Sequence, residues 1–214
     1  MNCCPHCRDS ETFFSEFTAK RDLRKYRRKG PLRTTRMLLE ALRARGSDAR
    51  TLLDVGGGVG AIQHELLDGG LTRAVHVDAS RAYLKASAEE ATRRGHQGKI
   101  EYRFGDFVDL APTLPEADIV TLDRVVCCYP HIEPLVEASA RKAERLYGLA
   151  YPRERRAVRA FVGAGNLYFR IRRTNFRSYV HPRRAILAVL ARSGFRLASA
   201  NQTYMWHVEV FERA

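Results

Sequence analysis

The sequence lacks long hydrophobic runs, internal repeats and low-complexity tracts. No apolar stretch approaches the ~20 residues that a helix needs to cross a bilayer, so we expect no membrane-spanning segment. No apolar segment of roughly 7–15 residues stands near the N-terminus ahead of a small-residue cleavage site, so we expect no signal peptide. These absences predict a cytoplasmic protein without a membrane partner.

Cysteine is also scarce, with five residues in 214, which argues against a disulfide framework. Three of the five lie in Cys3-Cys4-Pro5-His6-Cys7. A thioredoxin-like redox motif needs a strand in front of it, and too few residues precede Cys4. Zinc ligands normally come from two separated pairs rather than from one such short run. We therefore expect no metal site, and we expect these cysteines to be dispensable.

Acidic residues are outnumbered, with 24 Asp and Glu against 37 Lys and Arg and a net charge of +13. Such an excess favours an anionic partner, whether nucleic acid, an acidic small molecule or a membrane surface, and does not choose among them. The basic residues concentrate in segments 20–36 and 153–184. Each segment is either a solvated helix face or a surface directed at a shared anionic ligand.

Strand-like and helix-like patterns alternate along most of the chain. Residues 11–29 and 32–45 have helical patterns, split by Gly30-Pro31. The predicted strands are 51–55, 74–77, 100–104, 117–122, 146–150, 195–200 and 205–211. The predicted helices that follow the first strand are 61–67, 81–94, 133–145, 154–173 and 182–192. This order predicts an α/β fold with parallel strands, in which the last two strands form an antiparallel pair.

The most informative segment, Asp54-Val55-Gly56-Gly57-Gly58-Val59-Gly60, ends the first predicted strand. Glycines allow a tight turn and a close backbone approach to a ligand, and the N-terminus of the next helix favours negative charge. The second strand ends in Asp78, where a carboxylate can accept hydrogen bonds from both hydroxyls of a ribose. Together these features predict a nucleoside-containing cofactor beyond the carboxyl ends of the strands.

Two nucleoside cofactors fit this order. Gly56, Gly58 and Ala61 match the spacing of dinucleotide-binding loops, so NAD must be considered. Three features favour S-adenosylmethionine instead. Asp54 can serve the ammonium end of a methionine moiety, and Gly105-Asp106-Phe107 offers an acid and an aromatic ring for an adenine. We also expect no second domain that could hold a dehydrogenase substrate.

At these residues the sequence resembles the class I S-adenosylmethionine-dependent methyltransferases, over roughly residues 32–214. The segment 52–60 looks like the family's acid-x-Gly-x-Gly-x-Gly signature. The resemblance implies a Rossmann-like, seven-stranded, mostly parallel sheet flanked by helices. It also implies N-terminal lid helices within residues 1–45 and a cofactor-binding domain over residues 46–214. Within the class the chain is loosely similar to small-molecule enzymes of the magnesium-protoporphyrin O-methyltransferase kind.

The resemblance further implies a set of cofactor-binding residues at the ends of the first four strands. They are Asp54, Gly56, Gly57, Gly58 and Gly60, then Asp78, Ala79 and Ser80, then Gly105, Asp106 and Phe107, and finally Asp123 and Arg124.

Methyl transfer from a sulfonium needs mainly positioning, because the methyl group is already activated. A general base helps only when the acceptor must lose a proton. His131 is the candidate base and Tyr129 the candidate for contact with substrate or sulfur, since both follow the fourth strand. The alternatives are a solvent-exposed histidine and a tyrosine that packs under a loop. The segment 127–130, Cys-Cys-Tyr-Pro, departs from the Asn/Asp-Pro-Pro-Tyr motif, which disfavours methylation of exocyclic amino groups on nucleic-acid bases.

The segment 153–180 combines arginines with Phe161, Tyr168, Phe169, Phe176 and Tyr179. Aromatic rings beside cations suit a flat anionic substrate or stacked bases, while the alternative is an amphipathic helix whose aromatics enter the core. We expect a small anionic or aromatic metabolite as substrate. An RNA methyltransferase and a non-catalytic nucleoside-binding protein on the same fold stay open, and the oligomeric state is not predicted.

Overall fold

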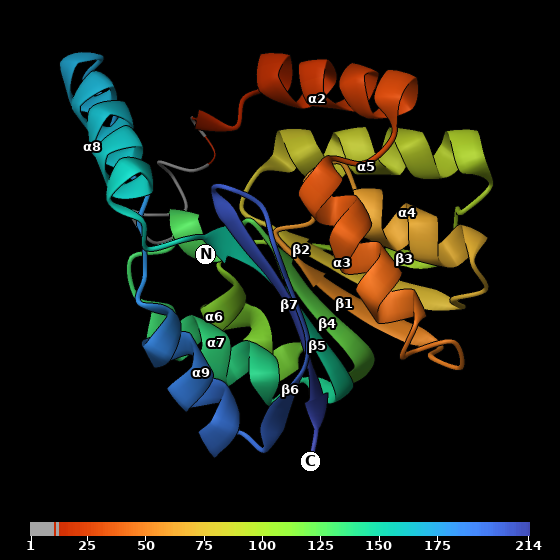
Figure 1. Cartoon of the computed structure of the whole chain (residues 1–214). Coiled ribbons are helices and arrows are strands. Elements are labelled where there is room, and N and C mark those ends of the chain that lie inside the picture. Colours follow the sequence, from red (N-terminus) through yellow and green to blue (C-terminus); the bar gives the residue numbers. More distant parts are fainter. Residues whose placement is uncertain (1–10, 12) are drawn as a thin grey trace.

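The computed structural model describes residue 11 and residues 13–214. A seven-stranded sheet with the order β3-β2-β1-β4-β5-β7-β6 forms its centre (Figure 1). Strands β1 to β5 are parallel to one another, and β7 runs antiparallel to both β5 and β6. The strands are β1 Thr51–Val55, β2 Arg73–Asp78, β3 Ile100–Phe104, β4 Ala117–Asp123, β5 Ala143–Pro152, β6 Phe195–Gln202 and β7 Trp206–Arg213.

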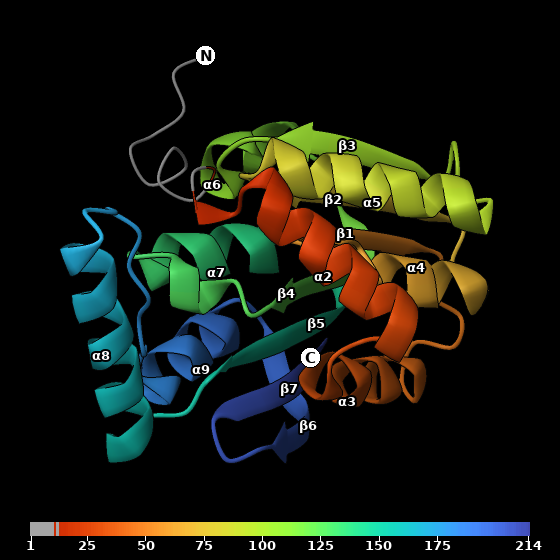
Figure 2. The same cartoon turned by 90° about the horizontal axis from the view of Figure 1, so that it is seen from above.

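Helices cover both faces of the sheet, and Figure 2 shows the same layers from above. On one side lie α3 (Arg33–Arg43), α4 (Ala61–Asp68) and α5 (Arg81–Arg94), with α2 (Glu16–Lys29) packed on α5. On the other side lie α6 (Phe107–Leu110), α7 (Ile132–Ala140) and α9 (Arg183–Arg192), while α8 (Arg156–Ile171) stands at the edge. Short 3-10 turns are η1 (Ala111–Thr113) and η2 (Val126–Cys128). None of the helices in the described part is long and apolar enough to cross a membrane.

The central strands are buried on both faces, which explains their nearly continuous apolar sequences. Neighbouring side chains on a strand point to opposite faces. Leu52 accordingly packs with α3 and α4, whereas Leu53 packs with the core around α7 and α9. In β4, Ile119 likewise packs in the core with α3 and α4, and Val120 packs in the core around α7 and α9. The two cores fix the register of the sheet and therefore the positions of the strand ends.

All seven predicted strands are confirmed, as is the antiparallel last pair. Ser80 caps α5, because its Oγ accepts a hydrogen bond from Tyr83 N at 3.2 Å. The prediction of a helix over 133–145 is wrong at its C-terminal end. Helix α7 ends at Ala140, and β5 starts at Ala143 because Ala143 pairs with Ala117 of β4. Pairing with β4 thus overrides the helix preference of residues 143–146.

Helix α2 is fixed to α5 by a small apolar cluster and by a buried acid. Leu23 and Tyr26 pack against Tyr83. Beside them Glu90, whose side chain is fully buried, accepts hydrogen bonds from Arg27 Nε at 2.8 Å and Arg94 Nε at 2.8 Å. Burial alone would raise the pKa of Glu90, but the surrounding guanidinium groups lower it to about 2. The acid therefore stays ionised and holds the two helices together.

Candidate functional site

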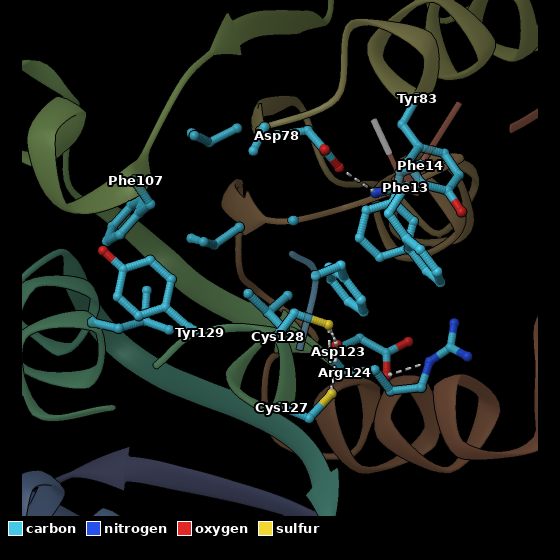
Figure 3. Close-up of a pocket in the computed structure, with 18 of the residues that line it drawn as sticks. Phe13, Phe14, Asp78, Tyr83, Phe107, Asp123, Arg124, Cys127, Cys128 and Tyr129 are labelled. Atoms are coloured by element: carbon cyan, nitrogen blue, oxygen red, sulfur yellow. Dashed lines mark hydrogen bonds and ion pairs between the residues drawn. The ribbon is translucent and has the colours of Figure 1, made fainter. Parts of the chain in front are cut away.

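Two adjoining cavities open at the carboxyl ends of β1, β2, β3 and β4, with volumes of about 380 and 310 Å³. Both are lined by Gly56, Gly58, Asp123 and Arg124. Figure 3 shows the larger cavity, with Phe107 and Tyr129 at one end and Phe13, Phe14 and Tyr83 at the other. Ligands of parallel α/β sheets bind at this edge, so the cavities are the candidate site.

The glycine loop, residues 56–60, forms the floor between the cavities. Gly56 and Gly58 have φ of 63° and 58°, a region that residues with a Cβ rarely adopt. A Cβ on Gly56 would lie 2.5 Å from Val125 Cγ2, so this glycine allows close packing under the loop. A Cβ on Gly58 would meet nothing closer than the Tyr83 ring at 3.9 Å and would occupy cavity space. Gly58 therefore leaves its backbone open to a ligand.

The other two glycines of the loop serve the packing beneath it. A Cβ on Gly57 would lie 2.6 Å from Asp54 Oδ2, and one on Gly60 would lie 2.5 Å from Gln63 Nε2. Gly57 lines the smaller cavity. Gly60 lines neither cavity, because it is the N-cap of α4 and is turned towards α5. The structure thus places Gly60 in the turn and not in the binding surface.

Asp54 is a buried acid with one satisfied oxygen. Its Oδ1 accepts a hydrogen bond from Thr121 Oγ1 at 2.7 Å, and its Oδ2 has no partner among the described residues. Burial raises the pKa of Asp54 to about 6. The residue lines the smaller cavity. An unpaired carboxylate oxygen beneath a backbone turn is suited to a hydrogen-bond donor supplied by a ligand.

Asp78 ends β2 and faces the larger cavity together with Ala79. Its Oδ2 accepts a hydrogen bond from Gly58 N at 3.0 Å, and its Oδ1 accepts one from Ser80 N at 2.8 Å. These bonds hold the carboxylate against the glycine loop. Ser80 itself is fully buried and lines neither cavity; it caps α5 and donates through Oγ to Phe14 O at 2.7 Å.

The acid after β3 is linked to the loop after β4. Asp106 caps α6 by accepting a hydrogen bond from Val108 N at 2.8 Å. The Tyr129 hydroxyl donates to the same carboxylate, with oxygen separations of 3.0 and 3.1 Å. Gly105, Asp106, Phe107 and Tyr129 all line the larger cavity. The structure therefore brings together the predicted adenine-side residues and the predicted substrate-contact tyrosine.

His131 does not reach the site, so its placement as a general base at the ligand edge is corrected. It is the N-cap residue of α7, its side chain is exposed, and it lines neither cavity. A side chain at a helix N-cap here points to solvent, although the residue follows the correct strand. No histidine of the described part lines either cavity.

Asp123, the last residue of β4, and Arg124, which follows it, line both cavities. Asp123 Oδ2 accepts a hydrogen bond from Thr35 Oγ1 of α3 at 2.5 Å, and burial raises the pKa of Asp123. Arg124 has φ of 63°, and its N–H donates to Ala150 O at 2.8 Å. A non-glycine residue in this region stores strain of about 1–3 kcal/mol, which is typical of ligand sites.

Aromatic side chains close the end of the larger cavity beyond the glycine loop. This aromatic wall consists of Phe13, Phe14, Phe169 and Phe176. Phe13 stacks on Phe176 with centroids 4.1 Å apart, and it meets the edge of Phe169 at 5.1 Å. The sequence indicated Phe169 and Phe176, but not Phe13, Phe14, Tyr83 or Trp206, which also line the cavity.

The remaining aromatics of segment 153–180 lie elsewhere. Phe161 and Tyr168 are exposed on α8, and Tyr179 lines neither cavity. No group of three or more His, Cys, Asp or Glu side chains in the described part could hold a metal ion. The cysteines at positions 3, 4 and 7 lie outside the described residues, so their predicted dispensability stays a prediction.

Comparisons with known proteins agree with this geometry. A family model described as a methyltransferase domain matches residues 53–145, which span β1 to the start of β5. No curated protein matches the chain. Many solved structures share its fold.

Three of these structures illustrate the likeness, each below 25% sequence identity. The match to magnesium protoporphyrin IX methyltransferase from Synechocystis, with bound SAM, covers 100% of this chain and 100% of that enzyme, at 16% identity and a TM-score of 0.71. The same enzyme with bound SAH covers 85% of this chain and 82% of its own, at 20% identity and 0.69. An O-methyltransferase family 2 protein from Planctomyces limnophilus, in complex with apigenin, covers 93% of this chain and 62% of its own, at 18% identity and 0.69.

The buried Asp54 generates a prediction about stability. Because the pKa of Asp54 is raised from 3.8 to about 6, the unfolded chain releases this proton at lower pH than the folded chain does. Below pH 4 the substitution Asp54→Asn should therefore change the free energy of unfolding little. As the pH rises from about 4 to about 6 the wild type loses stability, and at pH 7 Asp54→Asn should be more stable by about 1–3 kcal/mol.

Urea unfolding at pH 4 and pH 7 measures this difference. Asp118→Asn is the matched control with the opposite sign, because Asp118 accepts hydrogen bonds from Arg50 N and Thr51 N, which lower its pKa despite partial burial. Asp118→Asn should destabilise the protein at pH 7. Equal destabilisation by both substitutions would contradict the assignment of Asp54 as an unsatisfied buried acid.

Proposed function

We propose that the chain is an S-adenosylmethionine-dependent methyltransferase that methylates a small, flat acceptor with aromatic or anionic character. A methyltransferase-domain model matches residues 53–145, and the fold is that of class I methyltransferases, which supports this proposal. The observation that carries this proposal is the composition of the larger cavity. Fixed carboxylates and a glycine loop lie at one part of it, and an aromatic wall closes the other. A nucleoside and a planar acceptor fit these two parts, respectively.

In this proposal the residues after β2 and β3 hold the adenosine. Asp78 is kept in place by Gly58 N and Ser80 N, and its remaining acceptor capacity faces the cavity for the ribose hydroxyls. Asp106 and Phe107 supply an acceptor and a ring for the adenine. Ala79 and Gly105 leave room beside them because they have small side chains or none.

The residues after β1 and β4 hold the methionine end. Asp54 Oδ2 and Asp123 Oδ1 are both buried without a hydrogen-bond partner in the described part of the chain, although Asp123 Oδ1 forms an ion pair with Arg124 Nε at 3.7 Å. An ammonium group would supply the missing donors, so the two acids fit this group. Gly56, Gly57, Gly58 and Arg124 line the same space, where backbone N–H groups and a guanidinium suit a carboxylate. Gly60 and Ser80 contribute indirectly, through the turn and the α5 cap.

When bound, S-adenosylmethionine supplies an activated methyl group on a sulfonium. The protein's part is then to hold the acceptor atom in line with this group and to exclude water. The aromatic wall stacks the acceptor, and Arg124, which lines both cavities, attracts its anionic substituent. Tyr129 donates to Asp106 beside Phe107, at the end of the cavity opposite the aromatic wall, so we propose that it is a positioning residue that orients Asp106.

Described residues before β1 cover the site, and the segment that leads into α2 is called the entry strap, residues 13–15. Helix α2 itself is held by Leu23, Tyr26 and the ion pair of Arg27 with Glu90. The strap instead touches both sides of the cavity mouth, through Phe13 on Phe176 and through Phe14 O, which accepts from Ser80 Oγ. We propose that the strap opens for ligand exchange while α2 stays in place, within an N-terminal cover of residues 1–45 on a domain of residues 46–214.

The cofactor assignment predicts a specific loss in Asp78→Asn. Removing the charge that accepts the ribose hydroxyls should weaken binding of S-adenosylhomocysteine by about 1.5–3 kcal/mol, as for other hydrogen bonds to charged groups. Isothermal titration calorimetry measures the affinity. Asp109→Asn is the control, because Asp109 is an exposed acid nearby that lines neither cavity. This variant should bind S-adenosylhomocysteine with the affinity of the wild type. Saturable binding of NAD without binding of S-adenosylhomocysteine would overturn the assignment.

The acceptor assignment predicts transfer of labelled methyl to planar phenols, aromatic carboxylates or porphyrins, and not to RNA. Phe169→Ala should raise KM for the acceptor about tenfold or more through lost stacking, with unchanged affinity for S-adenosylhomocysteine. Phe161→Ala, which removes an exposed ring from the same helix, should leave both values unchanged. If RNA is methylated instead and KM for it rises steeply with salt, the acceptor is a nucleic acid.

The strap predicts a local change in protease sensitivity. S-adenosylhomocysteine should slow chymotryptic cleavage after Phe13 and Phe14, because ligand contacts hold the strap closed. Tryptic cleavage after Arg24 in α2 should proceed at the same rate with and without ligand. Mass spectrometry of the fragments distinguishes the sites. If the ligand changes cleavage at neither site, the strap does not open and close with ligand binding. If the ligand protects both sites equally, α2 moves as well.

A further inference from the structure

Helix α8 exposes large apolar side chains to solvent. Of its residues, Val158 is the buried one. The exposed fractions are 67% for Phe161, 59% for Leu167, 59% for Tyr168 and 71% for Ile171. Elsewhere in the described chain such residues are single: Phe17, Leu197 and Tyr204. Exposed apolar residues gathered on one element indicate an interaction surface.

The exposed residues form a continuous stripe along the helix. Phe161, Ala164, Tyr168 and Ile171 follow one another at intervals of three or four residues and so share one face. Val158 and Phe169 lie on a different face, which contacts the rest of the protein. In Figures 1 and 2 α8 stands at the periphery of the molecule. The apolar stripe, residues 157–171 on this face, is therefore directed outward.

Arginines flank the stripe, and most of them have no acidic side chain within ion-pair distance among the described residues. Between Glu154 and Glu209 the sequence contains no Asp or Glu. Arg159 pairs with Glu154 at 3.4 Å across exposed side chains, where such a pair is weak. The other arginines at the two ends of the helix carry net positive charge, and they are Arg155, Arg156, Arg170, Arg172 and Arg173. The partner of this surface must therefore offer both apolar contact and negative charge.

Three occupants can be compared on this basis. A second copy of α8 would cover the stripe but would bring two basic helices together, which costs energy by like-charge repulsion. A nucleic acid would neutralise the arginines but would leave Leu167 and Ile171 in water. The surface of an anionic bilayer supplies acyl chains for the stripe and phosphates for the arginines at the same time. Charge and apolarity together favour the bilayer.

We propose that α8 docks on the surface of an anionic phospholipid bilayer, with its apolar stripe at the level of the upper acyl chains and its arginines among the headgroups. The helix lies on the membrane and does not cross it. At 1.5 Å per residue its sixteen residues extend only about 24 Å. A single helix of this kind binds reversibly, and the binding weakens as salt screens the arginines.

Docking has a consequence for access to the cavity, which rests on the proposed function. Phe169 near the end of α8 and Phe176 beyond it belong to the aromatic wall. A docked α8 would place the mouth of the larger cavity next to the lipid interface. Flat hydrophobic acceptors that partition into membranes could then enter without crossing bulk water.

Co-sedimentation of the purified full chain with vesicles tests the docking. Vesicles of phosphatidylcholine containing phosphatidylglycerol should bind the protein at low salt, and vesicles of phosphatidylcholine alone should not. The triple variant Phe161→Ser, Leu167→Ser, Ile171→Ser should lower the partition coefficient by about tenfold or more, because the stripe is lost. Leu197→Ser, an exposed apolar residue of β6, should bind as the wild type does.

The arginines are tested by a matched pair of triple variants. Arg156→Gln, Arg159→Gln, Arg170→Gln removes charge beside the stripe. Arg24→Gln, Arg28→Gln, Arg36→Gln removes the same charge from exposed positions of α2 and α3. The first should reduce binding to phosphatidylglycerol vesicles several-fold more than the second. Equal losses would show general electrostatic attraction and would overturn the docking of α8.

A fluorescence measurement reports the position of the helix. Phe161→Trp adds one indole to the single native Trp206, and brominated acyl chains should quench the added emission more than that of the wild type. The proposal is wrong if the protein does not bind these vesicles. This includes the outcomes in which the protein binds RNA instead, or forms a dimer that the serine triple variant dissociates. Calorimetry with S-adenosylhomocysteine on the serine variant keeps the two proposals apart, because docking can fail while cofactor affinity is unchanged.

Discussion

The turn that follows β1 constrains the geometry of the whole site. Five residues must leave the end of a fully buried strand, pass over the carboxylate of Asp54 and enter α4. At Gly56 any Cβ would collide with Val125, and at Gly57 it would collide with Asp54 itself. The backbone can therefore approach both the core and a ligand only because side chains are missing there. The positions of Asp78 and Arg124 follow from this approach, since both border the same loop.

This arrangement keeps a polar group in an apolar interior, which lowers the stability of the folded protein. Asp54 keeps one oxygen without a partner in the described structure, and burial raises its pKa to about 6. The central strands around it supply compensating stability, with Leu53, Val120 and Leu149 fully buried in the adjacent core. Binding sites commonly use such an excess of core stability to keep groups that a ligand satisfies better than the empty protein does.

The chemistry of the strand ends could be predicted from the sequence because it is local. A strand pattern followed by Asp54 and the glycines, and the next strand followed by Asp78, are readable without tertiary knowledge. The rule that parallel strands present their carboxyl ends at one edge then brings these residues together. The same rule failed for His131, since following the correct strand does not fix where a side chain at a helix N-cap points.

Residues that reach the site from afar could not be predicted in this way. Phe13 and Phe14 meet Phe176 from the opposite end of the chain, and Thr35 reaches Asp123 from α3. The spacing of these residues along the sequence does not indicate that they are in contact. The early start of β5 was missed for the same reason, because it depends on pairing with Ala117 of β4. The basic segments also needed the structure: Arg27 is neutralised by Glu90, whereas the arginines of α8 flank an uncovered apolar stripe.

We propose that the two adjoining cavities together hold the cofactor at the glycine loop between them and the acceptor at the aromatic wall of the larger one. A crystal structure of the chain with S-adenosylhomocysteine tests it most directly. We expect difference density for the ribose at Asp78, for the amino-acid end beside Asp54 and Asp123, and for the sulfur directed towards Phe176. Density for the ligand elsewhere, or a sulfur directed away from the aromatic wall, would contradict it.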